Sequence, residues 1–158
     1  MTGLTAYRAR IQPDWIDFNG HLRDAYYALL ASLAIDDVMD QLGLDGGYRE
    51  RTHCTLYTLE WHMHFLHEIK GSDELAVTTR VLDVDRKRIH AACDFHCPRL
   101  AEPAATAEMM LLHVHQGEKP SSASFPPEVL ARLEGLKLSE SALAQRGLGS
   151  RKIEIKRR

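Results

Sequence analysis

Residues 22–42 carry the sequence LRDAYYALLASLAIDDVMDQL, in which apolar positions recur at spacings of three and four, as on an α-helix. Between Ala25 and Ile35 only Ser32 is strongly polar, so this helix is apolar around most of its circumference. A helix of that kind is enclosed by other structure rather than lying on a surface. Gly43 follows as a typical C-terminal stop. We therefore expect one long central helix wrapped by the rest of the chain.

The rest of the chain is typical of strands, because its apolar residues mostly alternate in steps of two. The segments predicted as strands are 5–12, 57–65, 75–84, 89–96 and 104–115, with a connecting loop at 45–52 and an amphipathic helix at 128–143. A strongly curved antiparallel sheet can bury one nearly all-apolar helix by wrapping around it. The sequence therefore predicts an α+β fold, with a curved antiparallel five-stranded sheet around one long helix and a short C-terminal helix.

The predicted strand at 57–65 has one apolar and one polar face. Strict alternation puts Tyr57, Leu59, Trp61, Met63 and Phe65 on one face and Thr58, Glu60, His62 and His64 on the other.

Composition fits one globular domain. The 158 residues are 44% apolar and 27% charged, and we interpret 1–158 as one domain with its core at 5–135 and a C-terminal helix and basic tail at 126–158. A net charge of −2 gives no reason to expect nucleic acid or an anionic membrane as partner. No apolar run is long enough to span a membrane and no signal-like start is present, which predicts a cytoplasmic protein. The three cysteines lack a Cys-x-x-Cys pair and are expected to be buried free thiols.

The loop before the long helix carries the sequence Trp15-Ile16-Asp17-Phe18-Asn19-Gly20-His21-Leu22. Its Asp17, Gly20 and His21 resemble the Asp-x-x-Gly-His signature of the 4-hydroxybenzoyl-CoA thioesterase family of hotdog proteins, and the resemblance covers about 5–135. It implies a hotdog fold, hydrolysis of an acyl-CoA thioester, and no cofactor besides the coenzyme A carried by the substrate. It also implies a homodimer or a dimer of dimers with active sites at the subunit junction, paired through the strand at 57–65.

By the same resemblance, Asp17 matches the catalytic carboxylate. A thiolate departs easily, so the enzyme has to supply a base or nucleophile and to stabilise an oxyanion. Unpaired backbone N–H groups of Gly20, His21 and Leu22 are expected to offer an anion site at the N-terminus of the helix. Alternatively, Asp17 is a helix N-cap and His21 only fixes the turn.

The amino-acid sequence at 20–27 and 57–64 resembles a narrower subgroup, the betainyl-CoA thioesterases of bacterial carnitine degradation. Many members of the wider family have an Asn pair where this chain has Arg23-Asp24, which leaves the choice open between betainyl and another small or aromatic acyl group. Aromatic faces with a carboxylate nearby bind a trimethylammonium cation. The candidate substrate-binding residues are Trp15, Asn19, Asp24, Tyr26, Tyr27, Glu60, Trp61 and His64. Ordinary packing explains the aromatic ones equally well.

The predicted hairpin at Arg86, Lys87 and Arg88 is the best basic cluster for the phosphates of coenzyme A, although a solvated turn explains it too. Two other classes of protein remain open. One is a hotdog protein that binds acyl-CoA without hydrolysing it, which the presence of Asp17 disfavours. The other is a metal-binding protein that uses Glu60-x-His62-x-His64, although we expect no metal because a cysteine cluster and a His-Glu-x-x-His helix are missing.

Overall fold

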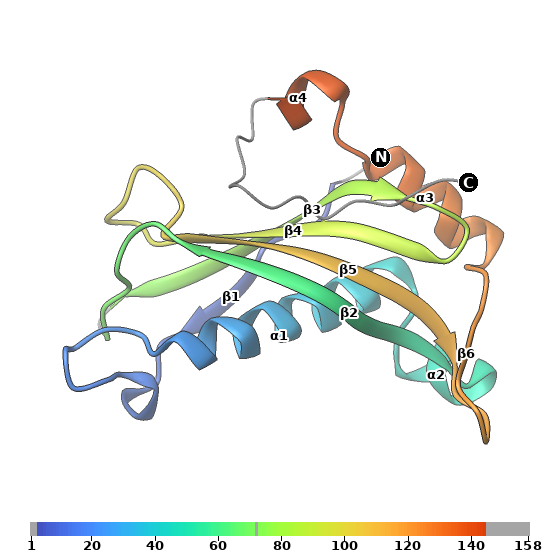
Figure 1. Cartoon of the computed structure of the whole chain (residues 1–158), viewed down its shortest axis with the longest axis horizontal. Helices are drawn as coiled ribbons and strands as arrows, with labels where there is room; N and C mark the ends of the chain where they lie inside the picture. The colour runs from blue at the N-terminus through green and yellow to red at the C-terminus, as the bar shows by residue number, and fades with distance from the viewer. Residues whose placement is uncertain (1–2, 72, 145–158) are drawn as a thin grey trace.

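The computed structural model describes residues 3–71 and 73–144, and the basic tail expected beyond them lies outside the described residues. Five strands form one curved antiparallel sheet in the order β1-β3-β4-β5-β2 (Figure 1). They are β1 (Tyr7–Arg10), β2 (Cys54–Phe65), β3 (Glu74–Val84), β4 (Arg88–His96) and β5 (Ala105–His115). A strand of two residues, β6 (Ser121–Ser122), pairs with β5 and was not predicted. The predicted five-stranded antiparallel sheet is confirmed.

The long helix α1 (Asp24–Leu42) lies along the concave side of this sheet (Figure 1). Leu30 and Ala31 have no exposed surface, and the ring of Tyr27 lies 5.5 Å from that of Phe95 on β4. Burying one large apolar side chain contributes roughly 1.5–3 kcal/mol, so the buried side of α1 is a main source of stability. The predicted enclosure on all sides is not found among the described residues, because Leu29, Ser32 and Asp36 form an exposed stripe along α1. Gly43 ends the helix in the left-handed region, with φ of 83°.

The remaining helical segments correct two predictions. Residues 45–52, predicted as a loop, contain the helix α2 (Gly46–Thr52), which begins where the Asp45 carboxylate accepts a 2.8 Å hydrogen bond from the Tyr48 N–H. The single helix predicted at 128–143 is two helices, α3 (Pro127–Leu136) and α4 (Glu140–Ala144). They are separate because the chain between them contacts β3. The Leu138 N–H donates to the Val81 carbonyl, in the part of β3 that lies beyond its pairing with β1. A short 3-10 helix, η1 (Pro13–Trp15), follows β1.

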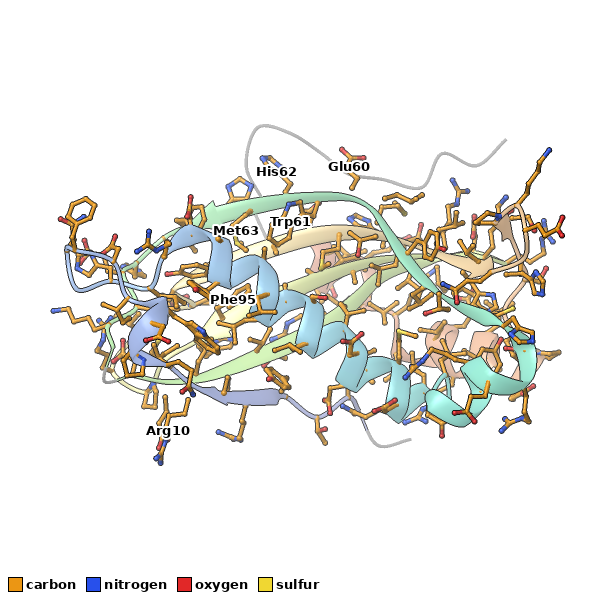
Figure 2. The ribbon with its side chains drawn as sticks, turned by 90° about the horizontal axis from the view of Figure 1, so that it is seen from below. Arg10, Glu60, Trp61, His62, Met63 and Phe95 are labelled. Carbon is orange, nitrogen blue, oxygen red and sulfur yellow. The ribbon has the colours of Figure 1, made fainter. Side chains whose placement is uncertain are left out.

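A β-bulge at Leu59 corrects the predicted faces of β2. Thr58 pairs with Leu111 but Glu60 pairs with Met110, so Leu59 has no partner on β5 and the alternation shifts by one residue. Trp61, Met63 and Phe65 therefore lie on the face toward α1, while Tyr57 shares the outer face with Glu60, His62 and His64. Figure 2 shows Glu60 and His62 pointing away from α1, and Trp61 and Met63 pointing toward it.

No helix among residues 3–71 and 73–144 is long and apolar enough to cross a membrane.

Candidate active site

The loop between β1 and α1 is a compact turn closed by its own backbone. The Asp17 N–H donates to the His21 carbonyl at 2.8 Å, and the Gly20 N–H donates to the Asp17 carbonyl at 3.0 Å. Gly20 has φ of 82°, in the left-handed region that favours glycine. The Leu22 N–H donates to the Ile69 carbonyl at 2.7 Å, which ties the loop to the segment after β2. These bonds fix where the Asp17 side chain lies.

The Asp17 carboxylate accepts two hydrogen bonds from its own loop. The N–H groups of Asn19 and His21 donate to Oδ1, at 2.8 and 3.1 Å. The bond from the His21 backbone is the main cause that lowers the pKa of Asp17 below its usual value of 3.8, so the side chain is ionised at neutral pH. Both bonds use Oδ1, and the side chain of Asn19 also contributes to lowering the pKa of Asp17.

The oxyanion site differs from the prediction. The N–H groups of Gly20, His21 and Leu22, expected to be unpaired, all donate within the protein. Arg23 is the N-cap residue, in an extended conformation, and α1 begins at Asp24. Among the described residues, the Asp24 N–H has no hydrogen-bond partner, as expected at the first position of a helix. An unpaired backbone donor is therefore found at the first residue of α1 and not at Gly20, His21 or Leu22.

A pocket of about 540 Å³ opens beside this loop. Its lining comes from the loop, the first turn of α1 and the segment after β2. The lining residues are Asp17, Phe18, His21, Leu22, Arg23, Asp24, Tyr27, Phe65, Leu66, His67 and Glu68. The pocket thus combines aromatic rings with three carboxylates, of Asp17, Asp24 and Glu68, and with the basic side chains of His21, Arg23 and His67.

Residues 65–68 are the part of the site that the sequence did not reveal. His21 Nε2 lies 2.9 Å from Glu68 Oε2, and Phe65 packs edge-on against Tyr27 with ring centroids 5.0 Å apart. In the sequence, Phe65 could be recognised only as an apolar strand residue, and Glu68 belonged to no recognisable motif. A backbone bridge between His21 and Lys70 brings the two segments together.

The predicted substrate-binding residues divide into two groups. Asp24 and Tyr27 line the pocket, and Asn19 holds Asp17 through its backbone. The others do not line it. Trp15 and Tyr26 stack on each other with centroids 5.3 Å apart and pack against the core, and Trp61 lies on the inner face of β2. Glu60 and His64 lie on the outer face of the sheet.

The outer face of β2 also bears on the metal-site alternative. His62 and His64 rings lie 4.5 Å apart. Within residues 3–71 and 73–144, no group of three or more His, Cys, Asp or Glu side chains is arranged to hold a metal ion.

Arg86, Lys87 and Arg88 lie at the opposite end of the sheet from the pocket, at the β3–β4 hairpin (Figure 1). On β5, Arg88 pairs with Leu112. Ala105, which pairs with Phe95 and with the pocket residue Phe65, marks the other end of the strand. At about 3.3 Å per residue, those positions are about 23 Å apart along β5. The basic side chains also have local partners, since Arg86 donates to Ser124, Lys87 to Ser122 and Arg88 to Asp85.

Comparison with known proteins places the chain in a family. Residues 11–133 match the model of the thioesterase-like superfamily. A betainyl-CoA thioesterase of Pseudomonas aeruginosa is 44% identical over 140 residues, covering 89% of this chain and 87% of that protein. An L-carnitine dehydrogenase/betainyl-CoA thioesterase of Agrobacterium fabrum is 32% identical, covering 97% of this chain and 31% of that protein.

A solved structure shares the fold. A protein from Staphylococcus aureus, solved in complex with CoA, superposes with a TM-score of 0.80 at 28% identity, covering 97% of this chain and 96% of that one. The chain belongs to the thioesterase-like superfamily of hotdog proteins.

Proposed function

We propose that this thioesterase hydrolyses betainyl-CoA to betaine and coenzyme A, as a step of carnitine degradation. The observation that carries the proposal is the ionised Asp17 carboxylate, held by two backbone N–H groups in a pocket with aromatic and acidic walls. The two named relatives support the acyl group, because both are described as betainyl-CoA thioesterases.

The proposed reaction needs water and no cofactor apart from the coenzyme A of the substrate. Asp17 either attacks the thioester carbonyl itself or removes a proton from the water molecule that attacks. In both cases negative charge develops on the carbonyl oxygen, where the Asp24 N–H and the positive end of α1 stabilise it. The thiolate of coenzyme A then leaves without help from an acid, and water supplies the oxygen of the product carboxylate.

The walls of the pocket suit a cationic acyl group. Tyr27 and Phe65 offer ring faces and edges, and Asp24 and Glu68 offer negative charge. A quaternary ammonium group beside an aromatic ring gains about 0.5–1 kcal/mol when exposed and about 2 when desolvated. Phe18, 96% exposed on the loop, adds a ring that can cover a bound acyl group.

Arg23 is the arginine that lines the pocket, and we propose that it meets a phosphate of coenzyme A. Arg86, Lys87 and Arg88 lie at the opposite end of the sheet from the pocket of their own chain. They remain candidates only for the pocket of a second subunit.

We further propose a homodimer or a dimer of dimers, paired through β2. This strand is an edge of the sheet, is 12 residues long, and exposes Tyr57, Leu59, Trp61 and Phe65. Such an edge is a ready template for pairing with another chain. Because Phe65 and Leu66 line the pocket, a partner paired there would border the active site.

A cytoplasmic location is proposed as well. Cys54, Cys93 and Cys97 are buried and form no disulfide among the described residues, which fits a reducing compartment.

Thiol release from a panel of acyl-CoA esters tests the substrate. Betainyl-CoA should give a kcat/KM well above those of benzoyl-CoA and straight-chain acyl-CoAs. A preference for benzoyl-CoA or a long chain would replace the proposed acyl group, and binding without turnover of any ester would indicate a binding protein.

A further inference from the structure

We propose that Glu68 determines substrate specificity by supplying the negative charge that recognises a cationic acyl group. The inference rests on the proposed function, because it concerns how the same pocket tells betainyl-CoA from an uncharged ester.

Substrate chemistry restricts where such a charge can lie. In a betainyl thioester the quaternary nitrogen is two bonds from the carbonyl carbon, so the cation must lie in the same pocket as the reacting atoms. The group that recognises it therefore has to be close to Asp17. Glu68 meets this condition, because it lines the pocket and its carboxylate contacts His21, whose backbone N–H holds Asp17.

The backbone around Glu68 is fixed although its side chain is exposed. The His67 N–H donates to the Ala104 carbonyl at 2.8 Å, Arg99 donates to the Glu68 carbonyl, and Ile69 is fully buried. The Glu68 side chain is 64% exposed at the pocket wall. An exposed ion pair stabilises a fold very little. A rigidly placed carboxylate in an open pocket is thus better suited to a ligand than to the fold.

The other carboxylates are less suitable. Asp24 is the first residue of α1, where its Oδ1 accepts from the Ala25 N–H at 2.8 Å and its charge complements the helix dipole. Asp17 is required for the chemistry. Glu60, a candidate from sequence, lies on the outer face of β2 and does not line the pocket.

The contact between Glu68 and His21 explains how the carboxylate is held before substrate arrives. His21 Nε2 lies 2.9 Å from Glu68 Oε2, so this ring nitrogen carries the proton. The bond orients the carboxylate over the pocket. When the cation enters, the second carboxylate oxygen can face it while the first stays on His21.

A pair of substrates with one shape separates charge recognition from every other role. In 3,3-dimethylbutanoyl-CoA a carbon atom replaces the quaternary nitrogen of betainyl-CoA. The ratio of the two kcat/KM values, betainyl over dimethylbutanoyl, therefore reports recognition of charge. We expect Glu68→Gln, which can still accept the His21 hydrogen bond, to lower this ratio about tenfold, equal to 1.4 kcal/mol. Glu68→Lys should lower it further.

Glu118→Gln is the matched control, because Glu118 is exposed on the turn after β5 and does not line the pocket. It should leave the ratio unchanged. Equal losses for both substrates in Glu68→Gln would overturn the inference, and would make Glu68 a positioning residue for His21. An unchanged ratio in a folded Glu68→Gln protein would also overturn it, with the proposed function intact. Failure of the wild type to hydrolyse betainyl-CoA would overturn both.

Discussion

The backbone N–H of His21 donates a 3.1 Å hydrogen bond to Oδ1 of Asp17, and the His21 carbonyl accepts from the Asp17 backbone N–H at 2.8 Å. The two residues that begin and end the loop motif therefore hold each other at both the main chain and the side chain. This reciprocal contact explains why an aspartate and a histidine at this spacing make a defined site. The carboxylate is oriented and ionised before any substrate binds.

Replacing Asp17 with Asn tests its role in the chemistry. An amide oxygen can still accept the two loop hydrogen bonds, so the fold should persist while the negative charge is lost. We expect kcat for thiol release to fall about 10²- to 10⁴-fold, the usual contribution of a positioned base. Asp14→Asn, in the exposed η1 turn of the same loop, should keep wild-type activity. Turnover above a tenth of the wild-type value in Asp17→Asn would exclude this carboxylate as base or nucleophile.

The pH dependence of kcat/KM follows from the lowered pKa of Asp17. Because the ionised form is the reactive one and its pKa lies below 3.8, activity should show no acid limb from this group between pH 8 and pH 4.5. The same shift stabilises the folded protein above the unfolded pKa, and that stabilisation is lost as the pH falls through the folded value. Initial rates across this range test the prediction. A decline centred near pH 6 would indicate another base.

Two glycines with nearly the same backbone conformation allow the loop to be tested against the fold. Gly20 has φ of 82° and Gly43 has φ of 83°, and a Cβ atom on either would meet no atom within 4 Å. Alanine at each position should therefore cost a similar 1–2 kcal/mol of unfolding free energy, roughly, from the left-handed backbone alone. Only Gly20→Ala should also reduce kcat, because it disturbs the turn that holds Asp17. Equal kcat in the two variants would contradict this.

Local patterns predicted most of the architecture. The length of α1 follows from the run at 22–42, because helical periodicity is a property of neighbouring residues. The same is true of the alternating strands and of the glycine that ends the helix. The burial of α1 was overestimated, since Leu29, Ser32 and Asp36 are exposed. The Asp17 loop was recognisable because Asp17, Gly20 and His21 resemble the Asp-x-x-Gly-His signature of a known family.

Features that depend on pairing between distant segments were not predictable. The Leu59 bulge arises from the register of β2 against β5, and it moves Tyr57 to the outer face. Glu68 reaches His21 because the segments around them pair, although they are far apart in sequence. The helix α2 begins at a cap formed by the Asp45 side chain. This cap could not be recognised from a sequence segment that is polar and contains glycine.

The proposed pairing of subunits through β2 predicts a particular sensitivity to charge. Leu59 is 55% exposed on the edge strand, and Leu59→Lys would place a cation between paired edges. We expect the wild type to have at least twice the 17.9 kDa mass of the chain in light scattering, and Leu59→Lys to shift toward the monomer mass. Ala131→Lys, on the exposed side of α3, is the control and should leave the mass unchanged. A wild type that is monomeric at micromolar concentration would rule the proposed assembly out.

A buried pair far from the active site should govern stability in mild acid. The Tyr48 hydroxyl lies 3.0 Å from His113 Nε2, and His113 Nδ1 lies 3.1 Å from the Ala123 carbonyl. A carbonyl can only accept, so Nδ1 carries the proton, and Nε2 accepts from Tyr48. Tyr48→Phe leaves the buried Nε2 without its partner and should cost about 1–3 kcal/mol in denaturant unfolding.

Burial also lowers the pKa of His113 below its usual 6.5. The unfolded chain then binds more protons than the folded one below pH 6.5, so stability from this group is present above that pH and is lost as the pH falls through the folded value. His113→Gln should therefore lose less stability than the wild type between pH 7.5 and pH 5. His115→Gln, an exposed position on the same strand, should follow the wild-type pH dependence. If His113→Gln and the wild type lose equal stability over this interval, the acid sensitivity has to come from other residues.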